Sequence, residues 1–251
     1  MSFDVAADAY DRYMGKYSRL LSPQLADFAG VRSGHRVLDV GCGPGALTAE
    51  LVARVGASAV AAVDPSESFV AAARDRHPGV EVVRASAEKL PFPGRSFDAV
   101  LAQLVVHFMA DPRIGLAEMG RVTRQEGVIA ACVWDHAGQG PLELFWRAAR
   151  QLDPGVDDES RLPGVREGHL AELFEAAGLE QVEATVLWVS LAHPTFEAWW
   201  EPFTKGVGPA GSFLAGLNAD QQVELRERCR ALVPEAPFVV TARAWAARGL
   251  A

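Results

Sequence analysis

The sequence predicts an α/β fold: a doubly wound, mostly parallel, Rossmann-like sheet of seven strands with helices on both faces. Two observations lead to it. Between residues 35 and 134, short apolar runs alternate with helical segments five times, which is typical of parallel strands joined by right-handed crossovers. After Trp134 this rhythm breaks, and helical insertions come before and between two further strands. We expect these insertions to form a lid.

Each predicted strand is a short apolar run bounded by turn-forming or polar residues. In chain order they are "HRVLDV" (35–40), "AVAAVD" (59–64), "VEVVRAS" (80–86), a strand beginning with "FDAVLAQLVVHF" (97–108), "VIAACVW" (128–134), "EQVEATVLWVSLA" (180–192) and "PFVVTARAWAARG" (237–249).

The helices between these strands carry start and stop signals. The segment after the first strand places Leu47, Leu51 and Val55 on one face and ends at Gly56. A second helix is predicted over 65–77, and a third begins at Asp111–Pro112, an N-cap followed by proline. The chain therefore predicts one domain with a helical cap (1–34), a core (35–134), two helical insertions (135–166 and 194–234) and the end of the sheet (167–193 and 235–251).

Composition narrows the class of protein. The formal net charge of -8 argues against a nucleic-acid partner, because such proteins usually carry a basic face. The three cysteines are widely spaced and suggest neither a metal site nor a disulfide framework. No signal peptide and no apolar run long enough to cross a membrane are evident. We expect a cytoplasmic protein without a metal and without a membrane partner, either a monomer or a homodimer.

The stretch "VLDVGCGPGA" (37–46) places three glycines between the first strand and the following helix. In an open parallel sheet, ligands bind outside the carboxyl ends of the strands, and glycine lets a ligand approach the backbone closely. The stretch also satisfies the dinucleotide pattern, and Asp64, 19 residues after Gly45, suits ribose hydroxyls of any adenosine ligand. These residues alone leave NAD and other adenosine ligands open.

Neighbouring residues discriminate between these ligands. Asp39 lies two residues before the first glycine and faces the same crevice; its charge opposes a pyrophosphate but suits an ammonium or sulfonium group. After the third strand, "ASAEKLPF" (85–92) places Ala87 and Glu88 where an adenine amino group can be met. Both features favour a cationic adenosine ligand over NAD.

At this point the chain resembles the class I S-adenosylmethionine-dependent methyltransferases, in particular the small-molecule group that includes ubiquinone and menaquinone enzymes. The motifs that carry the resemblance are "VLDVGCGPGALT", "AVDPS", "ASAEKLPFPGRSFDAVLAQLVVHF" and "EMGRVTRQEGVIAACVW", within residues 36–134. The resemblance implies S-adenosylmethionine as cofactor, S-adenosylhomocysteine as product and a small organic molecule as methyl acceptor.

The resemblance also implies roles for single residues. The methionine part of the cofactor is expected at the glycine loop and at the end of the fourth strand, and the adenosine part beyond the second and third strands. An N-terminal helix that folds over the cofactor would bring an arginine to its carboxylate. The implied cofactor-binding residues are Tyr17, Arg19, Asp39, Gly41, Cys42, Gly43, Asp64, Pro65, Ser66, Ser86, Ala87, Glu88 and Gln103. Ser86 departs from the aspartate common in the family, so a less fixed contact with adenine is expected there.

The acceptor decides whether a general base is needed at all. His107, four residues beyond Gln103, is the best candidate for one, although a packed structural histidine explains the position as well. His136 is a weaker candidate. The acidic run "DPGVDDES" (153–160) is interpreted as a solvated loop.

Aromatic residues suggest an acceptor pocket. Tyr10, Tyr13 and Tyr17 are spaced to share one face of the N-terminal helix, either over the cofactor or simply against the core. Trp199, Trp200 and Phe203 (the last insertion) suit a lid over a flat acceptor, but an insertion core or a dimer contact explains them equally. The function expected is small-molecule methyl transfer; the alternatives are a non-catalytic S-adenosylmethionine-binding protein and an NAD-dependent oxidoreductase.

Overall fold

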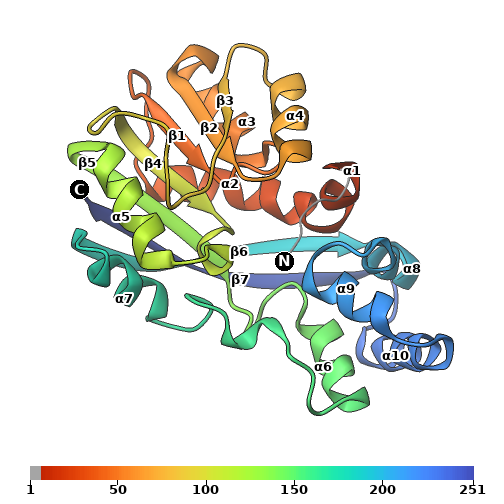
Figure 1. Ribbon diagram of the computed structural model, residues 1–251. Coiled ribbons are helices and arrows are strands. Elements are labelled where there is room, and N and C mark those ends of the chain that lie inside the picture. Colours follow the sequence, from red (N-terminus) through yellow and green to blue (C-terminus); the bar gives the residue numbers. More distant parts are fainter. Residues whose placement is uncertain (1–6) are drawn as a thin grey trace.

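The computed structural model describes residues 7–251 as one seven-stranded sheet with helices on both faces (Figure 1). Across the sheet the strand order is β3-β2-β1-β4-β5-β7-β6. The strands are β1 (Val37–Val40), β2 (Val60–Asp64), β3 (Glu81–Arg84), β4 (Phe97–Gln103), β5 (Thr123–Trp134), β6 (Glu180–His193) and β7 (Phe238–Leu250). The predicted fold class is confirmed.

The strand order places the candidate site. β1 pairs in parallel with both β2 and β4, so the winding direction reverses at β1 and opens a crevice beyond its carboxyl end. β4 and β5 are parallel neighbours with Gln103 opposite Cys132, so the loops after these two strands emerge side by side. Only β7 runs antiparallel, between β5 and β6.

Ten α-helices are described in residues 7–251. They are α1 (Ala7–Tyr10), α2 (Lys16–Phe28), α3 (Ala46–Val55), α4 (Glu67–Arg76), α5 (Pro112–Val122), α6 (Glu143–Leu152), α7 (His169–Ala176), α8 (Phe196–Trp200), α9 (Gly208–Gly216) and α10 (Ala219–Leu232). A π-helical turn, η1 (Asp11–Gly15), joins α1 to α2, and short 3-10 turns are η2 (Ala57–Ala59), η3 (Val106–Phe108), η4 (Glu159–Arg161) and η5 (Glu201–Lys205).

Two apolar cores fill the two faces of the sheet. On one face Leu21 and Leu25 of α2 pack in the same core as Leu51 of α3 and the aromatic residues of the insertions. On the other face α5 and α7 supply Met119 and Phe174, both fully buried. No helix within residues 7–251 is long and apolar enough to cross a bilayer.

The second insertion differs from the continuous helical run expected from the sequence. It divides into α8, η5, α9 and α10 because Gly206 and Gly208 take positive φ values of 69° and 66°, which end one helix before the next begins. Asn218 then starts α10 with a capping box. The segments fold back so that α10 contacts α6, far from the strands of the glycine loop (Figure 1).

Candidate active site

The glycine loop follows β1, and its three glycines serve different purposes. All three have positive φ values. A Cβ on Gly41 would lie 2.4 Å from Val105 Cγ2, and one on Gly45 would lie 2.4 Å from His77 Nε2, so close packing requires glycine at both positions. A Cβ on Gly43 would meet nothing within 4 Å. Gly43 is therefore the glycine beside open space, where a ligand can approach the backbone.

Asp39 of β1 is a buried carboxyl group, and only one of its two oxygens has a hydrogen-bond partner among the described residues. Thr48 donates a 2.6 Å hydrogen bond to Oδ2, whereas Oδ1 is buried without a partner among the described residues. Burial raises the pKa of Asp39 to about 7, and the charge of Asp64 adds to this rise. An ammonium group beside Oδ1 would supply the missing partner.

Asp64 ends β2 and holds the glycine loop through its carboxylate. Oδ2 accepts a hydrogen bond from the backbone N–H of Gly43 at 2.9 Å, and Oδ1 accepts one from that of Ser66 at 2.8 Å. Burial raises the pKa of Asp64, while the two backbone donors oppose that rise. Each carboxylate oxygen keeps a second lone pair for a ligand hydroxyl.

A cavity of about 340 Å³ joins the glycine loop to the N-terminal segment and the end of β4. Its lining residues are Tyr10, Asp11, Ser18, Asp39, Gly41, Cys42, Gly43, Pro44, Ala46, Leu47 and Gln103. Gln103 donates from Nε2 to the backbone oxygen of Ser18 at 3.1 Å, and its Oε1 is buried without a partner within residues 7–251. Two orphaned oxygens, on Asp39 and Gln103, thus border one cavity.

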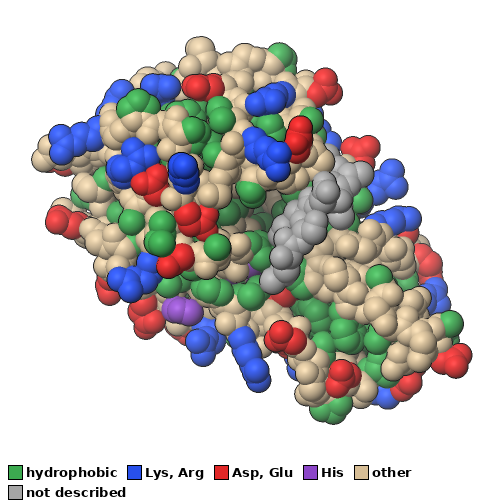
Figure 2. Space-filling model, viewed as in Figure 1, with side chains coloured by type: hydrophobic (Ala, Val, Ile, Leu, Met, Phe, Trp, Pro, Cys, Tyr) green, Lys and Arg blue, Asp and Glu red, His purple; other side chains and the backbone are tan. Residues whose placement is uncertain are grey.

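A second cavity, the aromatic pocket, lies between the N-terminal segment and the insertions. It is lined by Arg12, Tyr13, Lys16, Tyr17, Pro141, Leu142, Leu191, His193, Ala198, Trp199, Pro202 and Phe203 and has a volume of about 350 Å³. In Figure 2 hydrophobic side chains line a hollow near the middle of the face shown, with a histidine at its base. An apolar, aromatic pocket of this kind suits a flat organic molecule.

Comparisons with known proteins identify the family. A family profile described as "Methyltransferase domain" matches residues 38–131. The chain is 34% identical over 188 residues to an uncharacterized methyltransferase of Mycobacterium bovis, covering 74% of this chain and 70% of that protein. It is 32% identical over 174 residues to a ubiquinone/menaquinone biosynthesis C-methyltransferase of Cupriavidus taiwanensis, covering 62% and 71%.

This chain belongs to the class I S-adenosylmethionine-dependent methyltransferases. Other curated relatives are matched over less of their length, such as 57% of a malonyl-[acyl-carrier protein] O-methyltransferase of Erwinia billingiae. A solved structure of a Bacillus halodurans protein described as a putative methyltransferase covers 91% of the chain with a TM-score of 0.60 at 18% identity, over 97% of its own length. That structural likeness supports the fold of the methyltransferase.

The site of this methyltransferase fits S-adenosylmethionine on its own geometry. The free oxygen of Asp39 matches the ammonium of the methionine part, and the open space at Gly43 admits a ligand against the backbone. Asp64 retains the acceptor capacity that ribose hydroxyls need. Cys42, whose pKa is raised well above its usual value by burial, also lines this cavity as a neutral thiol. Among the predicted cofactor residues, Asp39, Gly41, Cys42, Gly43 and Gln103 meet at this cavity.

The residues expected to hold adenine lie beyond the ends of β2 and β3. Ser66 caps α4, and Pro65 is exposed beside it. Ala87 is buried, and Ser86 begins the turn that closes when Lys89 N donates to its carbonyl oxygen at 3.2 Å. Glu88 Oε1 accepts hydrogen bonds from the backbone N–H groups of Ala110 and Asp111. It thereby holds the loop before α5.

Two other predicted cofactor residues lie outside the glycine-loop cavity. Tyr17 lines the aromatic pocket, and its hydroxyl forms a 3.0 Å hydrogen bond with His193 Nε2. Arg19 is exposed, with Nη1 3.9 Å from Asp11 Oδ1. The three tyrosines do not share one face: Tyr10 lines the glycine-loop cavity and Tyr13 the aromatic pocket. The π-helical turn η1 explains this, because it winds more slowly than an α-helix and shifts the register between them.

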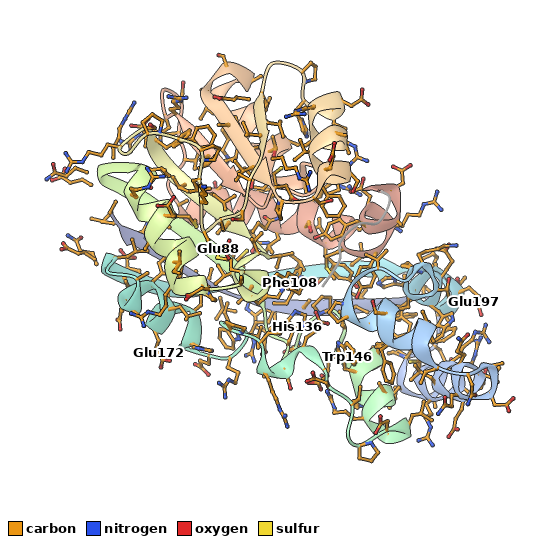
Figure 3. All side chains as sticks on the ribbon, viewed as in Figure 1. Glu88, Phe108, His136, Trp146, Glu172 and Glu197 are labelled. Carbon is orange, nitrogen blue, oxygen red and sulfur yellow. The ribbon has the colours of Figure 1, made fainter. Side chains whose placement is uncertain are left out.

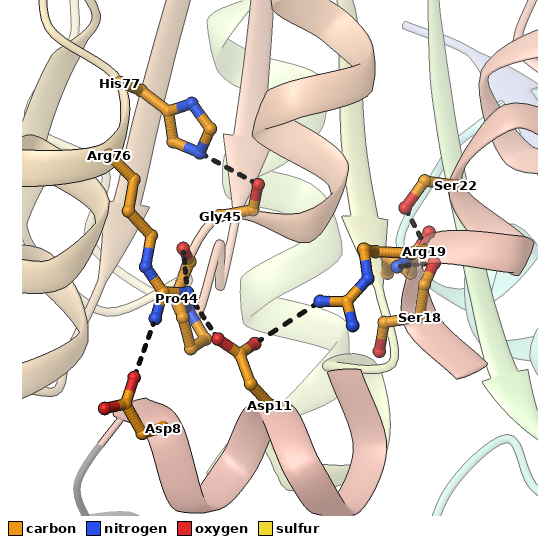
Figure 4. Close-up of polar contacts among 10 residues, drawn as sticks. Asp8, Asp11, Ser18, Arg19, Ser22, Pro44, Gly45, Arg76 and His77 are labelled. Atoms are coloured by element: carbon orange, nitrogen blue, oxygen red, sulfur yellow. Dashed lines mark hydrogen bonds and ion pairs between the residues drawn. The ribbon is translucent and has the colours of Figure 1, made fainter. Parts of the chain in front are cut away.

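Ion pairs fasten the N-terminal segment to the glycine loop (Figure 4). Arg76 of α4 lies 2.6 Å from Asp11 and 3.3 Å from Asp8, and it donates to the backbone oxygen of Pro44 at 3.2 Å. One arginine therefore contacts both the covering segment and the loop beneath it.

We expect Arg76→Ala to speed release of S-adenosylhomocysteine several-fold while changing stability little, because exposed ion pairs contribute about 0.2–1 kcal/mol each. Stopped-flow dissociation and thermal unfolding would measure the two effects. Arg113→Ala, at an exposed position on α5, is the control. Equal release rates in all three proteins would mean that these ion pairs do not restrain the segment.

His107 lies in η3, after β4, and is buried with Nδ1 lacking a partner among the described residues. Burial, and next the charge of His136, lower the pKa of His107 well below its usual range. The imidazole is therefore neutral at neutral pH. It is suited to a hydrogen bond with a ligand more than to taking up a proton.

Sequence reasoning missed a buried carboxylate close to these histidines. Glu159 lies in the acidic run that was expected to be a solvated loop, yet it is only 4% exposed. Its Oε2 accepts a 2.9 Å hydrogen bond from Trp146 Nε1, and its Oε1 lies 3.8 Å from His136 Nε2. The surrounding charges gave no local signal, because the neighbouring acid Asp158 pairs with Arg150 while Glu159 does not.

Proposed function

We propose that this protein transfers a methyl group from S-adenosylmethionine to a small organic acceptor. The observation that carries the proposal is Oδ1 of Asp39 at the wall of the glycine-loop cavity. It is buried and has no partner among residues 7–251, which favours a cationic ligand there. Glycine-loop geometry alone suits NAD as well, but a carboxylate at this position disfavours a pyrophosphate. Family membership supports the same conclusion.

In the proposed mechanism the protein mainly binds and orients. Asp39 holds the ammonium of the methionine part, Asp64 the ribose hydroxyls, and Gln103 the methionine side near the acceptor. The bound cofactor supplies a methyl carbon on a sulfonium, from which transfer proceeds by in-line displacement. Tyr10 and the helix that follows it cover the cavity, and exclusion of water supports the positioning.

We propose that the acceptor enters the aromatic pocket and reaches the cofactor beside His107. The insertion residues Trp199 and Phe203 line that pocket and support its interpretation as a lid. Neutral His107 then offers its free Nδ1 to the acceptor. One relative is named a malonyl-[acyl-carrier protein] O-methyltransferase and another a ubiquinone/menaquinone biosynthesis C-methyltransferase, so the names alone do not select one chemistry. A cytoplasmic monomer or homodimer is proposed, and the free cysteines support the location.

Calorimetry with S-adenosylmethionine, S-adenosylhomocysteine and NAD tests the cofactor directly. Micromolar binding of the first two without NAD is the expected result. Binding of NAD alone would instead support the oxidoreductase alternative. Binding of the cofactor without methyl transfer to any acceptor would support the non-catalytic alternative.

Asp64→Ala is expected to weaken binding of S-adenosylhomocysteine by about 1.5–3 kcal/mol, the contribution of hydrogen bonds to a charged group. The variant also leaves the Gly43 N–H without its acceptor. Asp75→Ala, on the exposed side of α4, is the matched control and should bind as the wild type does. Unchanged affinity in the Asp64 variant would mean that the ribose lies elsewhere.

A further inference from the structure

A cluster of buried polar side chains lies beyond the carboxyl ends of β4 and β5. His107 and His136 follow these neighbouring strands, and their ring centroids are 5.5 Å apart. Glu159 comes from η4 and Tyr13 from the covering segment. Figure 3 shows His136 near Phe108 and above Trp146, at the centre of the molecule.

Three groups in this cluster have unused hydrogen-bonding capacity. The hydroxyl of Tyr13 and Nδ1 of His107 are buried without partners within residues 7–251. His136 has Nε2 directed at Glu159, and no hydrogen bond to its Nδ1 is present among the described residues. Buried polar atoms are normally paired, so the two orphaned groups on Tyr13 and His107 indicate a missing polar ligand.

Glu159 is unusual because a carboxylate this deeply buried requires a partner of opposite charge. Trp146 supplies only a neutral hydrogen bond, and the one cation-forming side chain at ion-pair distance within the described chain is His136, at 3.8 Å. A carboxylate beside Nε2 favours the tautomer that carries its proton on Nε2, which leaves the lone pair of Nδ1 free. Burial, followed by the charge of Glu159, also raises the pKa of Tyr13 well above its usual value. Tyr13 therefore stays a hydrogen-bond donor.

The loop that carries His136 is held rigidly. Asp135 is 2% exposed, and its Oδ2 accepts hydrogen bonds from Arg243 at 2.6 and 2.9 Å and from Gln139 N at 2.8 Å. Arg150 fastens the opposite side by binding Asp158, next to Glu159, at 2.5 Å. The distance between the His136 ring and the Glu159 carboxylate is thus set by two ion pairs on different elements.

We propose that His136 is the general base for the acceptor, that Glu159 is its positioning residue, and that Tyr13 and His107 hold a hydroxyl-bearing aromatic acceptor against it. This inference rests on the proposed methyl transfer. The acceptor hydroxyl gives its proton to His136 Nδ1, and its oxygen lone pair forms the bond to the methyl carbon. The carbon–sulfur bond breaks, its electron pair stays on the sulfur, and the imidazolium later releases its proton to water.

The surroundings favour a phenol over an aliphatic alcohol or an amine. Tyr13 and Phe203, which line the aromatic pocket, meet edge-on at 5.6 Å, and Phe145 stacks on Phe203 at 4.6 Å, so the pocket has flat, apolar walls. An imidazole is a strong enough base for a phenol, whose ordinary pKa is about 10, but not for an alcohol. A neutral amine acceptor needs no such base to attack.

The test uses 4-nitrocatechol, a phenol whose ionisation is visible in its absorption spectrum, together with S-adenosylhomocysteine or S-adenosylmethionine. Calorimetry with S-adenosylhomocysteine comes first; its failure would count against the proposed function itself. The loaded wild type is then mixed with 4-nitrocatechol below the pH at which the free probe ionises. We expect the spectrum of the ionised probe. The ionised fraction should be at least tenfold higher than in free solution at the same pH. An absence of binding, or binding without ionisation, would overturn the proposal.

Turnover of 4-nitrocatechol with S-adenosylmethionine tests the two roles separately. We expect Glu159→Gln to lower kcat at least tenfold with an unchanged KM for S-adenosylmethionine. His136→Ala should lower kcat about 100-fold, the size of a general-base contribution, and added imidazole should restore at least tenfold. Glu172→Gln, on the exposed face of α7 (Figure 3), is the control. An unchanged kcat in the Glu159 variant, or no effect of imidazole, would mean that these residues have only a structural role. The wild-type spectrum decides the matter if the variants do not fold.

Discussion

Asp39→Asn should weaken binding of S-adenosylmethionine about 100-fold, or about 3 kcal/mol, because it removes one member of a buried charge pair. The substitution keeps the size of the side chain, and the remaining carbonyl oxygen can still accept the hydrogen bond from Thr48. Calorimetry on wild type and variant measures the difference. Equal affinity in both would mean that the ammonium group binds elsewhere.

The same residue predicts how binding depends on pH. Without ligand, burial holds the pKa of Asp39 at about 7. An ammonium group binds the carboxylate form, so a proton must leave when binding occurs below pH 7. We expect wild-type affinity to fall by up to tenfold per pH unit below 7, with proton release, and no such fall in Asp39→Asn. A wild-type affinity that does not change between pH 5.5 and 7 would contradict this.

The pH dependence of stability without ligand has the opposite sign to that of ligand binding. Because the pKa of Asp39 is raised by folding, its carboxyl group destabilises the folded protein increasingly as the pH rises from about 4, its unfolded pKa, through about 7. Asp39→Asn should therefore be more stable than the wild type at pH 8 and similar to it at pH 4. Urea unfolding at both pH values measures this difference.

Arg243→Ala should lower the free energy of unfolding by about 3 kcal/mol, because it leaves the buried carboxylate of Asp135 without its cation. The variant should also lose turnover, because His136 follows Asp135 directly. Urea denaturation gives the first quantity and a methyl-transfer assay the second.

Two comparisons separate this effect from a general loss of β7. Arg248→Ala removes an ion pair on the same strand, with the exposed Glu183, and should cost only about 1 kcal/mol. The double variant Asp135→Asn, Arg243→Ala should recover at least 1 kcal/mol relative to Arg243→Ala. A double variant less stable than Arg243→Ala would show that the buried charge is not the cause.

Sequence reasoning succeeded where the signal is local. The glycine loop, Asp39 and the end of β4 were recognised from a strand followed by a turn, and the structure brings them to one cavity. It failed for the face shared by the three tyrosines, because a π-helical turn leaves no clear mark in an apolar pattern. It also failed for the helical run of the second insertion, where glycines with positive φ divide the helix.

Glu159 shows the limit most clearly. In the sequence it is one of several acids in a glycine- and proline-containing loop, and nothing nearby distinguishes it from Asp157 or Asp158. Its burial depends on Trp146 of α6 and on His136 after β5. Neither contact follows from local spacing, because both require the insertion to fold back over the end of the sheet.

By itself, then, the sequence determined the order and type of the strands, the position of the crevice and several of the residues that line it. These features depend on periodicity, turn chemistry and the parallel connection of consecutive strands, all of which act over short stretches of chain. Only the tertiary structure decided which side chains form the buried polar cluster: Tyr13, His107, His136 and Glu159 come from four separate segments. The physical reason is that burial and charge pairing between such segments depend on how helices and loops pack. The spacing of residues along the chain does not determine that packing.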